Sequence, residues 1–460
     1  MELDEVSLEE MLSARERRVH CQKELLSLHP GTLVCLTLNI PGPVKRLPLS
    51  EETFREGKKR IRQQFMAHRV PVLEERNYSA KTGNEAFYAV QGNPVQVKAW
   101  MASVEEGEPL GRLFDIDVLD SQGNKICRSQ VGLETRRCLL CGRPAPVCAR
   151  SRAHTVEELV CEAGRIMQDY FSARLSTAVM QAAVRALFYE VSVTPKPGLV
   201  DRANRGAHSD MDFFTMTDSI VALAPHFAAF ACEGFAWKGS LSELFSNIRS
   251  LGIRAEDDMF SATHGINTHK GLIFSLGILC AATGYLAGHH RKAGTEAILE
   301  TAAVMAADGM KDFRGIDTEN AKTHGEKLYA FYGITGIRGE AADGFPNVRQ
   351  YALPTLKKLL AEGAGLNDAG AVVLLYLLAH VEDTNIIARS DWETGRKVQQ
   401  MVSGKISENR NSKDLLQFAR ELDCYFVEKH LSPGGCADLL AISFFLYFWE
   451  QECSGMQEQA

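Results

Sequence analysis

The sequence lacks the short patterns that usually mark a nucleotide site. It has no Gly-x-x-x-x-Gly-Lys-Ser/Thr motif and no strand followed by Gly-x-Gly-x-x-Gly, so a bound nucleotide would need a different cradle. It also lacks internal repeats, low-complexity linkers and a Pro/Ser-rich hinge. The most membrane-like run, which begins at Gly271, is short for a span and contains Ser and Thr. We therefore predict that it is a buried core helix.

Excess positive charge is also missing. The formal net charge is −7, which argues against general binding to nucleic acids or membrane surfaces, because such binding needs clustered Lys and Arg. The 12 cysteines form no small disulfide framework, and the first residues are acidic where a secretory signal would be basic and then apolar. We therefore expect a protein of the reducing cytoplasm. With 45% hydrophobic and 24% charged residues, the composition is that of an ordinary globular chain.

The first third of the 460 residues alternates strand and helix signals. This predicts an α+β domain over residues 1–165 with a mainly antiparallel sheet. Residues 49–68 predict a helix, because Phe54, Ile61 and Phe65 recur at helical spacing. Strands are predicted at 32–40, 85–90, 95–100, 112–120 and 125–131, the last two joined by a turn at 121–124.

The strand signals end near Thr155. From there long segments of helical apolar period continue, joined by polar loops that contain Gly and Pro. We predict a second, all-α domain over residues 172–460. The boundary, between residues 155 and 172, rests on the change of period alone, and the whole chain is predicted to be a multidomain protein.

Two carboxylates stand out in the first domain. Asp115 and Asp117 are two residues apart on a predicted strand, so they share one face while Phe114, Ile116 and Val118 share the other. Carboxylates held side by side are able to bind Mg²⁺, which stabilises a pyrophosphate leaving group. Alternatively, the two carboxylates simply form the solvent-exposed face of an amphipathic strand.

A segment rich in cysteine and arginine follows. Cys138 and Cys141 have Cys-x-x-Cys spacing, and Cys148 and His154 are possible further zinc ligands. Because the later spacing is irregular, structural thiols are favoured over zinc. The arginines suggest a phosphate-rich ligand, since a guanidinium pairs with two phosphate oxygens, and the alternative is a solvated face. They are Arg136, Arg137, Arg143, Arg150 and Arg152.

The helical domain contains loops that carry charge and glycine instead of plain turn residues. A helix N-terminus offers free N–H groups, and glycine lets the backbone approach a ligand, so such loops bind anions. Loop carboxylates could hold Mg²⁺ beside a triphosphate. The five loops span residues 191–212, 255–271, 333–346, 380–389 and 431–440.

Single residues of these loops also have structural interpretations. Asp210 could cap a helix that begins near Met211, and Asp383 with Thr384 could cap another. His208 or His264 alone is more often a polar neighbour than a catalyst. Five charged, glycine-bearing loops in one domain nevertheless indicate a shared site.

The first domain resembles a known enzyme family. The segment "PGPVK", the turn Gly83-Asn84-Glu85, "PLGRLFDIDV" and "RRCLLC" are similar to apo-citrate lyase phosphoribosyl-dephospho-CoA transferases, also called holo-citrate lyase synthases. The resemblance implies attachment of a prosthetic group to a serine of the citrate lyase acyl carrier protein, with release of pyrophosphate. It further implies a nucleotidyltransferase-like site with Asp115 and Asp117 as catalytic metal ligands. The cofactor-binding candidates of this domain are Lys45, Arg112 and Arg137.

The second domain resembles another family. The motifs "PKPGLVDRANRGAHSDM", "GINTHKGLIFSLG", "TGIRGEAADGFP", "EDTN" and "LSPGGCADLL" are similar to triphosphoribosyl-dephospho-CoA synthases. The resemblance implies that the 2′-hydroxyl of 3′-dephospho-CoA attacks the ribose C1′ of ATP, that adenine leaves and that the triphosphate stays on the product. Two positions depart from the family pattern: Arg389-Ser390-Asp391 replaces Arg-Gly-Gly, and Cys436 replaces Ser.

Such a glycosyl transfer needs carboxylates near a cationic ribose, a base, and Mg²⁺ with cations for the triphosphate. The metal or base candidates are Asp201, Asp210, Glu256, Asp258 and Asp383. The candidates for binding ATP or dephospho-CoA are Lys196, His269, Lys270, Arg338 and Asn385.

The leading hypothesis is a bifunctional transferase that makes the citrate lyase prosthetic group and attaches it to the acyl carrier protein. One domain's product is then the other domain's substrate. The alternatives are a helical Mg²⁺-dependent nucleotide hydrolase or phosphotransferase, and a non-catalytic chaperone of the acyl carrier protein. The chaperone has no need of paired carboxylates.

Overall fold

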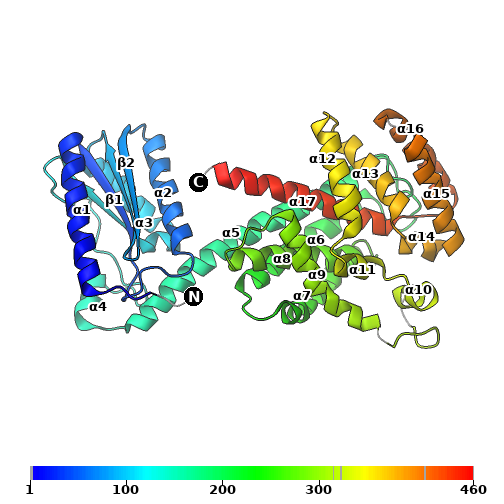
Figure 1. The fold of residues 1–460 in the computed structure, drawn as a ribbon, viewed down its shortest axis with the longest axis horizontal. Helices are drawn as coiled ribbons and strands as arrows, with labels where there is room; N and C mark the ends of the chain where they lie inside the picture. The colour runs from blue at the N-terminus through cyan, green and yellow to red at the C-terminus, as the bar shows by residue number, and fades with distance from the viewer. Residues whose placement is uncertain (1–3, 314, 322–323, 409–410, 459–460) are drawn as a thin grey trace. The chain divides into compact units, whose positions relative to one another are not determined.

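The computed structural model describes residues 4–313, 315–321, 324–408 and 411–458. The chain divides into two compact units, Met1–Phe171 and Ser172–Gln457. Figure 1 colours them from blue to red along the chain. Each unit is described by itself below.

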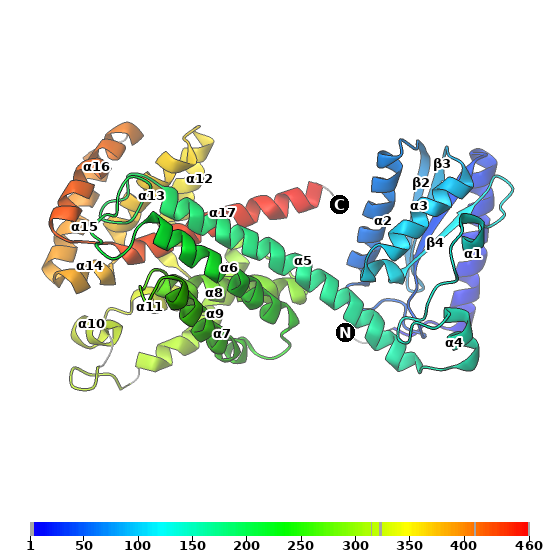
Figure 2. The same cartoon turned by 180° about the vertical axis from the view of Figure 1, so that it is seen from behind.

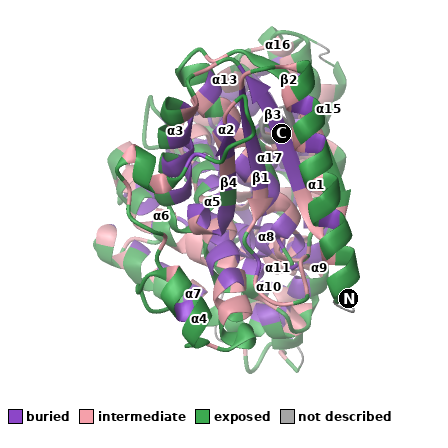
Figure 3. Ribbon diagram, turned by 90° about the vertical axis from the view of Figure 1, so that its left-hand side faces the viewer, coloured by how far each residue is buried: buried purple, intermediate pink, exposed green. Residues whose placement is uncertain are grey.

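The first unit contains a four-stranded sheet of order β2-β3-β1-β4, in which all paired strands are antiparallel. The strands are β1 Thr32–Leu38, β2 Val72–Ala80, β3 Gly83–Val90 and β4 Phe114–Leu119. Helix α1, Leu8–Leu28, covers one face, and α2, Ser50–Ala67, and α3, Pro94–Glu106, cover the other (Figures 1 and 2). The central strands β1 and β3 are therefore buried between two helical layers over most of their length, as Figure 3 shows, whereas β2 has no buried residue.

Alternation along the strands explains the two layers. Cys35 and Leu33 of β1 face α1, where they pack with Cys21 and Leu25. On the opposite face Phe65 of α2 meets the ring of Tyr88 edge-on, with centroids 5.7 Å apart. Each strand thus contributes one set of side chains to each layer.

Two predicted strands are wrong. Residues 95–100 belong to α3, because the Asn93 side chain caps its start by accepting from the N–H groups of Val95 and Gln96, with Pro94 in the first turn. Residues 125–131 contact the sheet only through an isolated bridge between Lys125 and Leu119, beside which the Ile126 N–H donates to the carbonyl oxygen of Val118. They then form a short 3₁₀ helix, Arg128–Val131. In residues 95–100 the cap at Asn93 therefore outweighed the preference of the valines for strands. The structure also contains α1 and β2, which the sequence analysis did not predict.

The second unit is helical throughout its described residues. It begins within α5, Val156–Ser192, which carries residues of both units. The other α-helices are α6 Phe213–Ala236, α7 Leu241–Ala262, α8 Lys270–Gly288, α9 Thr295–Ala306, α10 His324–Tyr332, α11 Gly336–Ala342, α12 Leu353–Ala361, α13 Leu366–His380, α14 Thr384–Arg389, α15 Trp392–Glu408, α16 Ser412–Glu428 and α17 Gly434–Glu458.

Helix α8 is the central element of this unit. Thirteen of its residues are buried, which confirms the predicted core helix at Gly271. Helices α6 and α8 are both long and apolar enough to cross a membrane, a test that core helices of globular proteins also pass. Their backbones touch at glycines: a Cβ on Gly284 would lie 2.0 Å from the carbonyl oxygen of Ala231, and one on Gly234 would lie 2.0 Å from that of Ala281. Small residues thus set the spacing of the two helices.

We predict that Gly284→Ala lowers the free energy of unfolding by about 1–3 kcal/mol, because the added methyl group forces α6 and α8 apart. Gly252→Ala, on α7, is the matched control. The added Cβ has no atom within 4 Å, and alanine favours the helix over glycine by about 1 kcal/mol, so this variant should not be destabilised. Urea unfolding followed by circular dichroism measures both. Equal destabilisation by the two variants would contradict this description of the packing.

Candidate active sites

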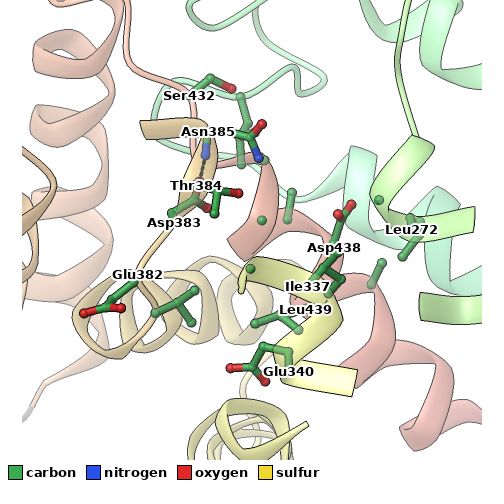
Figure 4. A pocket seen from close by; sticks show the side chains of 18 of the residues that line it. Leu272, Ile337, Glu340, Glu382, Asp383, Thr384, Asn385, Ser432, Asp438 and Leu439 are labelled. Atoms are coloured by element: carbon green, nitrogen blue, oxygen red, sulfur yellow. Dashed lines mark hydrogen bonds between the residues drawn. The ribbon is translucent and has the colours of Figure 1, made fainter. Parts of the chain in front are cut away.

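The second unit contains a pocket of about 920 Å³, and residues of all five charged loops line it. The lining includes Lys196 and His208 from the first loop, Thr268 and Lys270 from the second, and Gly336 from the third. Figure 4 shows the contributions of the last two loops, from Asp383 to Asn385 at the start of α14 and from Ser432 to Leu439 near the start of α17. Segments separated by more than 200 residues therefore meet around one cavity.

Asp383 joins two of these loops. Its Oδ1 accepts hydrogen bonds from the N–H groups of Asn385 and Ile386, at 2.8 and 3.2 Å, and so caps α14. Its Oδ2 accepts from the N–H of Cys436 in the first turn of α17, at 2.7 Å. Burial raises the pKa of Asp383, and the three backbone donors oppose the increase. The predicted cap at Asp383 is confirmed, and the same carboxylate also fixes the glycine-rich start of α17.

Two further acids lie in the same wall. Glu190, at the end of α5, forms a buried ion pair with Lys196, and burial raises the pKa of this carboxyl group while Lys196 opposes the increase. Asp438 of α17 has no hydrogen-bond partner for its carboxylate among the described residues. Burial, with repulsion from Glu190 and Asp383, holds the pKa of Asp438 well above its usual range.

Glycine allows these side chains to approach the backbone closely. A Cβ on Gly271, in the first turn of α8, would lie 2.4 Å from Asp438 Oδ2. A Cβ on Gly434 would lie 2.8 Å from the Asn385 amide nitrogen. The glycines of the second and fifth loops therefore make room for polar groups of the pocket itself, as well as for turns.

The pocket carries more negative than positive groups. Its basic side chains are Lys196, Lys270, Arg389 and Arg396. Its carboxylates are Glu190, Asp210, Glu340, Asp343, Glu382, Asp383 and Asp438. A polyphosphate could not displace water from this surface without added cations, because carboxylates and phosphates repel each other. The donor set of carboxylate oxygens fits Mg²⁺.

Of the residues that the sequence analysis proposed for this domain, Lys196, Asp210, Lys270, Asp383 and Asn385 line the pocket. Asp210 is largely exposed and lies 3.8 Å from His208 Nδ1. It does not cap a helix: α6 begins at Phe213, and Asp212 accepts from the N–H groups at its start. The predicted capping role of Asp210 is therefore wrong.

Two proposed residues lie buried behind the lining. Asp201 folds the first loop, because its Oδ1 accepts from the N–H groups of Ala203 and Asn204. His269 bonds through Nδ1 to Ser219 Oγ at 2.7 Å, and burial lowers the pKa of its ring to about 3. The ring is therefore neutral near pH 7 and offers a phosphate no positive charge.

The remaining three proposed residues form ion pairs outside the pocket lining. Glu256 lies 2.8 Å from Lys270 Nζ, so it positions a lysine that does line the pocket. Asp258 pairs with His226 at 2.7 Å. Arg338 pairs with Asp312 at 3.1 Å and lies over the rings of Phe274 and Phe313.

The first departure from the synthase pattern lies next to the pocket. Arg389, which the pattern keeps, lines the pocket and donates to the carbonyl oxygen of Ala207 at 3.2 Å. Ser390 and Asp391, which replace the two glycines, make local contacts outside the lining: Ser390 Oγ donates to the carbonyl oxygen of Ile386 at 2.8 Å, and Asp391 accepts from the Thr394 N–H at 2.7 Å. The second departure, Cys436, is buried. It contacts Asp383 through its backbone N–H, a group that serine also has. The replacement of Ser by Cys therefore leaves this bond in place.

In the first unit, Asp115 and Asp117 project from β4 at the edge of the sheet. Their cross-strand neighbours are Thr37 and Cys35, so both carboxylates lie on the face that α1 covers in part. Asp117 Oδ1 lies 2.5 Å from Lys125 Nζ. The predicted placement of the two carboxylates on one strand face is confirmed, and both remain accessible.

An arginine-rich pocket of about 1310 Å³ lies in the same unit. Arg112 and Arg137 line it, whereas Lys45 donates to the carbonyl oxygen of Ile40 and lies outside its lining. Arg136 also lines the pocket, and its Nη1 lies 4.0 Å from Asp115 Oδ1. This guanidinium is the structural link between the pocket and the carboxylates of β4.

Comparison with known proteins agrees with this two-part construction. Residues 6–170 match the family of apo-citrate lyase phosphoribosyl-dephospho-CoA transferases, and residues 176–455 match the family of ATP:dephospho-CoA triphosphoribosyl transferases. Protein CitXG of Leuconostoc mesenteroides subsp. cremoris is 34% identical over 459 residues, covering 96% of this chain and 97% of that protein. The chain belongs to the CitXG family.

Other relatives cover the whole chain or one part of it. Protein CitXG of Haemophilus influenzae is 33% identical over 454 residues, covering 96% of each chain. A probable 2-(5''-triphosphoribosyl)-3'-dephosphocoenzyme-A synthase of Streptococcus pyogenes serotype M3 is 41% identical over 290 residues, or 60% of this chain and 97% of that protein. The CitXG family thus joins two transferases in the order found here.

The sequence analysis missed several residues of the pocket. Glu190 lies in the mostly apolar helix α5 before the first charged loop, so loop composition does not mark it. Asp438 lies within the fifth charged loop, residues 431–440, but was not chosen as a site residue. Glu340, whose buried Oε2 has no hydrogen-bond partner among the described residues, lies in a motif that was singled out for its glycines. A charged residue inside an apolar helical stretch was the available signal, because such a residue is rarely buried unless it is paired.

We predict that Asp383→Ala lowers the free energy of unfolding by about 1–3 kcal/mol, because three backbone N–H groups lose their acceptor. Glu382→Ala is the matched control: this neighbouring carboxylate lines the pocket but is exposed, so the change should stay within about 0.5 kcal/mol. Thermal unfolding of both full-length variants measures the difference. An unchanged midpoint for Asp383→Ala would show that Asp383 does not hold the two loops together.

Proposed function

We propose that the chain is a bifunctional transferase in which each unit performs one reaction. The second unit forms 2′-(5″-triphosphoribosyl)-3′-dephospho-CoA from ATP and 3′-dephospho-CoA and releases adenine. The first unit transfers the phosphoribosyl-dephospho-CoA group to a serine of the citrate lyase acyl carrier protein and releases pyrophosphate. Membership of the CitXG family and the presence of a separate polar site in each unit support this assignment.

The pocket of the second unit suits a large anionic substrate. Its volume of about 920 Å³ lies at the upper end of ligand sites, which span about 300–1,000 Å³. The N-termini of α8 and α17 border it and offer free N–H groups. Lys196, Lys270 and Arg389 supply positive charge for the phosphates.

Asp438 is our candidate for the proton acceptor. In the proposed reaction the 2′-hydroxyl oxygen bonds to ribose C1′ and gives its proton to a base, while adenine leaves with the electrons of the broken C–N bond. Asp438 lies on the pocket wall with no hydrogen-bond partner among the described residues, and its raised pKa makes it a stronger base than an exposed carboxylate. Asp383 is less suited, because backbone donors already occupy both of its oxygens.

The carboxylates of this pocket also fit Mg²⁺. Asp210, which is exposed and lines the pocket, is the residue best placed to hold it. When bound, Mg²⁺ would neutralise part of the triphosphate charge. Lys196 holds Glu190 in an ion pair, so this carboxylate is less available as a ligand.

In the first unit Asp115 and Asp117 are the proposed Mg²⁺ ligands of a nucleotidyltransferase-like reaction. Arg136, 4.0 Å from Asp115, and the arginines of the neighbouring pocket would bind the triphosphate of the incoming intermediate. The incoming serine of the carrier protein must reach the exposed face of β4, which is an edge strand and therefore accessible.

Two variants separate the reactions. Asp438→Asn should lower adenine release from ATP and dephospho-CoA about 10²–10⁴-fold, because the base is lost. Supplied intermediate should still load the carrier protein. Asp117→Asn should leave adenine release intact while the intermediate accumulates and the carrier stays unmodified, since a metal ligand contributes several kcal/mol of charge stabilisation.

Chromatography of the small molecules and a mass spectrum of the carrier provide the two measurements. Asp218→Asn, an exposed carboxylate on α6 outside the pocket, is the control and should change neither. Loss of adenine release in a folded Asp117→Asn variant would contradict the assignment of one reaction to each unit. Release of ADP or phosphate in place of adenine would instead indicate a nucleotide hydrolase or phosphotransferase.

A further inference from the structure

The segment from Cys138 to His154 gathers four potential metal ligands that neither proposed reaction uses. One ligand atom each from Cys138, Cys141, Cys148 and His154 lies within 4.8 Å of all the others. The spacing, Cys-x₂-Cys-x₆-Cys-x₅-His, gave no regular motif in the sequence. In the structure the segment nevertheless folds so that these four ligand atoms lie together.

The backbone explains how the four residues meet. Cys138 donates its N–H to the carbonyl oxygen of Arg143, and Ala145 donates to that of Arg136, both at 2.7 Å, which closes a tight hairpin. Gly142 turns this hairpin with a φ of +69°, a conformation that favours glycine. The short helix α4, Ala145–Ser151, then presents Cys148 toward the hairpin.

One buried polar atom of the cluster is unpartnered: no described residue forms a hydrogen bond with His154 Nε2. The sulfurs of Cys141 and Cys148 lie 3.4 Å apart, too far for a disulfide bond. A tetrahedral zinc site with zinc–sulfur bonds of about 2.3 Å places its ligand atoms about 3.8 Å apart, which agrees with the observed cluster.

We propose that Cys138, Cys141, Cys148 and His154 bind a structural zinc ion. Four protein ligands leave no open position for substrate or water, so the ion would stabilise the fold without taking part in the chemistry. Three thiolates and a neutral imidazole give the zinc complex one net negative charge. The guanidinium of Arg143, whose Nε lies 3.3 Å from Cys141 Sγ, would offset that charge.

The zinc site would position the arginine-rich pocket of the first unit. Arg112 donates to the carbonyl oxygen of Cys138 at 2.5 Å, and Arg136, just before the hairpin, donates to the carbonyl oxygen of Arg112 at 3.0 Å. Cys138, Cys148 and His154 also contribute to the pocket wall. The ion would thus hold guanidinium groups near Asp115 by cross-linking the hairpin to α4.

Metal analysis of the full-length chain, purified under reducing conditions and dialysed against a weak chelator, tests the proposal. We expect about one equivalent of zinc per chain. Replacement of zinc by cobalt(II) should give the visible bands of a tetrahedral site and a thiolate-to-cobalt charge-transfer band. This spectrum reports on the wild-type protein, so it does not depend on whether a variant folds.

Single substitutions then identify the ligands. Cys141→Ser and His154→Ala should each reduce the bound zinc to a small fraction of an equivalent and make the segment around α4 more sensitive to protease. Cys161→Ser, at an exposed cysteine of α5 outside the cluster, is the matched control and should retain the full equivalent. A wild-type chain with free thiols that takes up neither zinc nor cobalt, or one with a Cys141–Cys148 disulfide, would overturn the proposal.

Discussion

The central constraint of the second unit is the excess of carboxylates around one pocket. Burial raises the pKa of Glu190, Asp383 and Asp438, so each needs a partner to remain ionised. Lys196 pairs with Glu190, and the backbone N–H groups of α14 and α17 pair with Asp383. Asp438 has no such partner among the described residues, which makes it the group best placed to react. The excess of carboxylates therefore explains both the contacts that hold the loops and the choice of Asp438 as the reactive group.

These contacts also explain why three helices, α8, α14 and α17, begin beside the same pocket. Asp383 brings the start of α14 to the start of α17, and Gly271 lets Asp438 lie against the first turn of α8. The helices behind them pack through small residues, as the contact between Gly284 and Ala231 shows, so their ends are held at fixed distances. A rigid core thus supports a site made of loops, and substrate binding need not order those loops first.

Much of this arrangement could be predicted from the sequence, because five charged, glycine-bearing loops in one helical domain indicated a shared site. The five loops do line one pocket, and Asp383 caps a helix as its sequence context suggested. Glu190 lies outside the five loops, and Asp438, although within the fifth, could not be distinguished there from its neighbours, since the importance of both arises from residues far along the chain. Helix α3 was missed because Val95 and Val97 favour strands locally, whereas capping by Asn93 and packing on the sheet decide the structure. The irregular spacing of Cys148 and His154 likewise concealed a compact cluster that the hairpin and α4 create.

The most direct test of the charge argument is calorimetric binding of ATP to the full-length chain with and without Mg²⁺. If the carboxylates of the pocket repel a bare triphosphate, ATP should bind at least about ten-fold more weakly in the presence of a chelator, a difference of about 1.4 kcal/mol. Asp210→Asn should narrow that difference, because it removes an exposed carboxylate of the pocket lining. Equal affinity of the wild-type chain for ATP with and without Mg²⁺ would contradict the account.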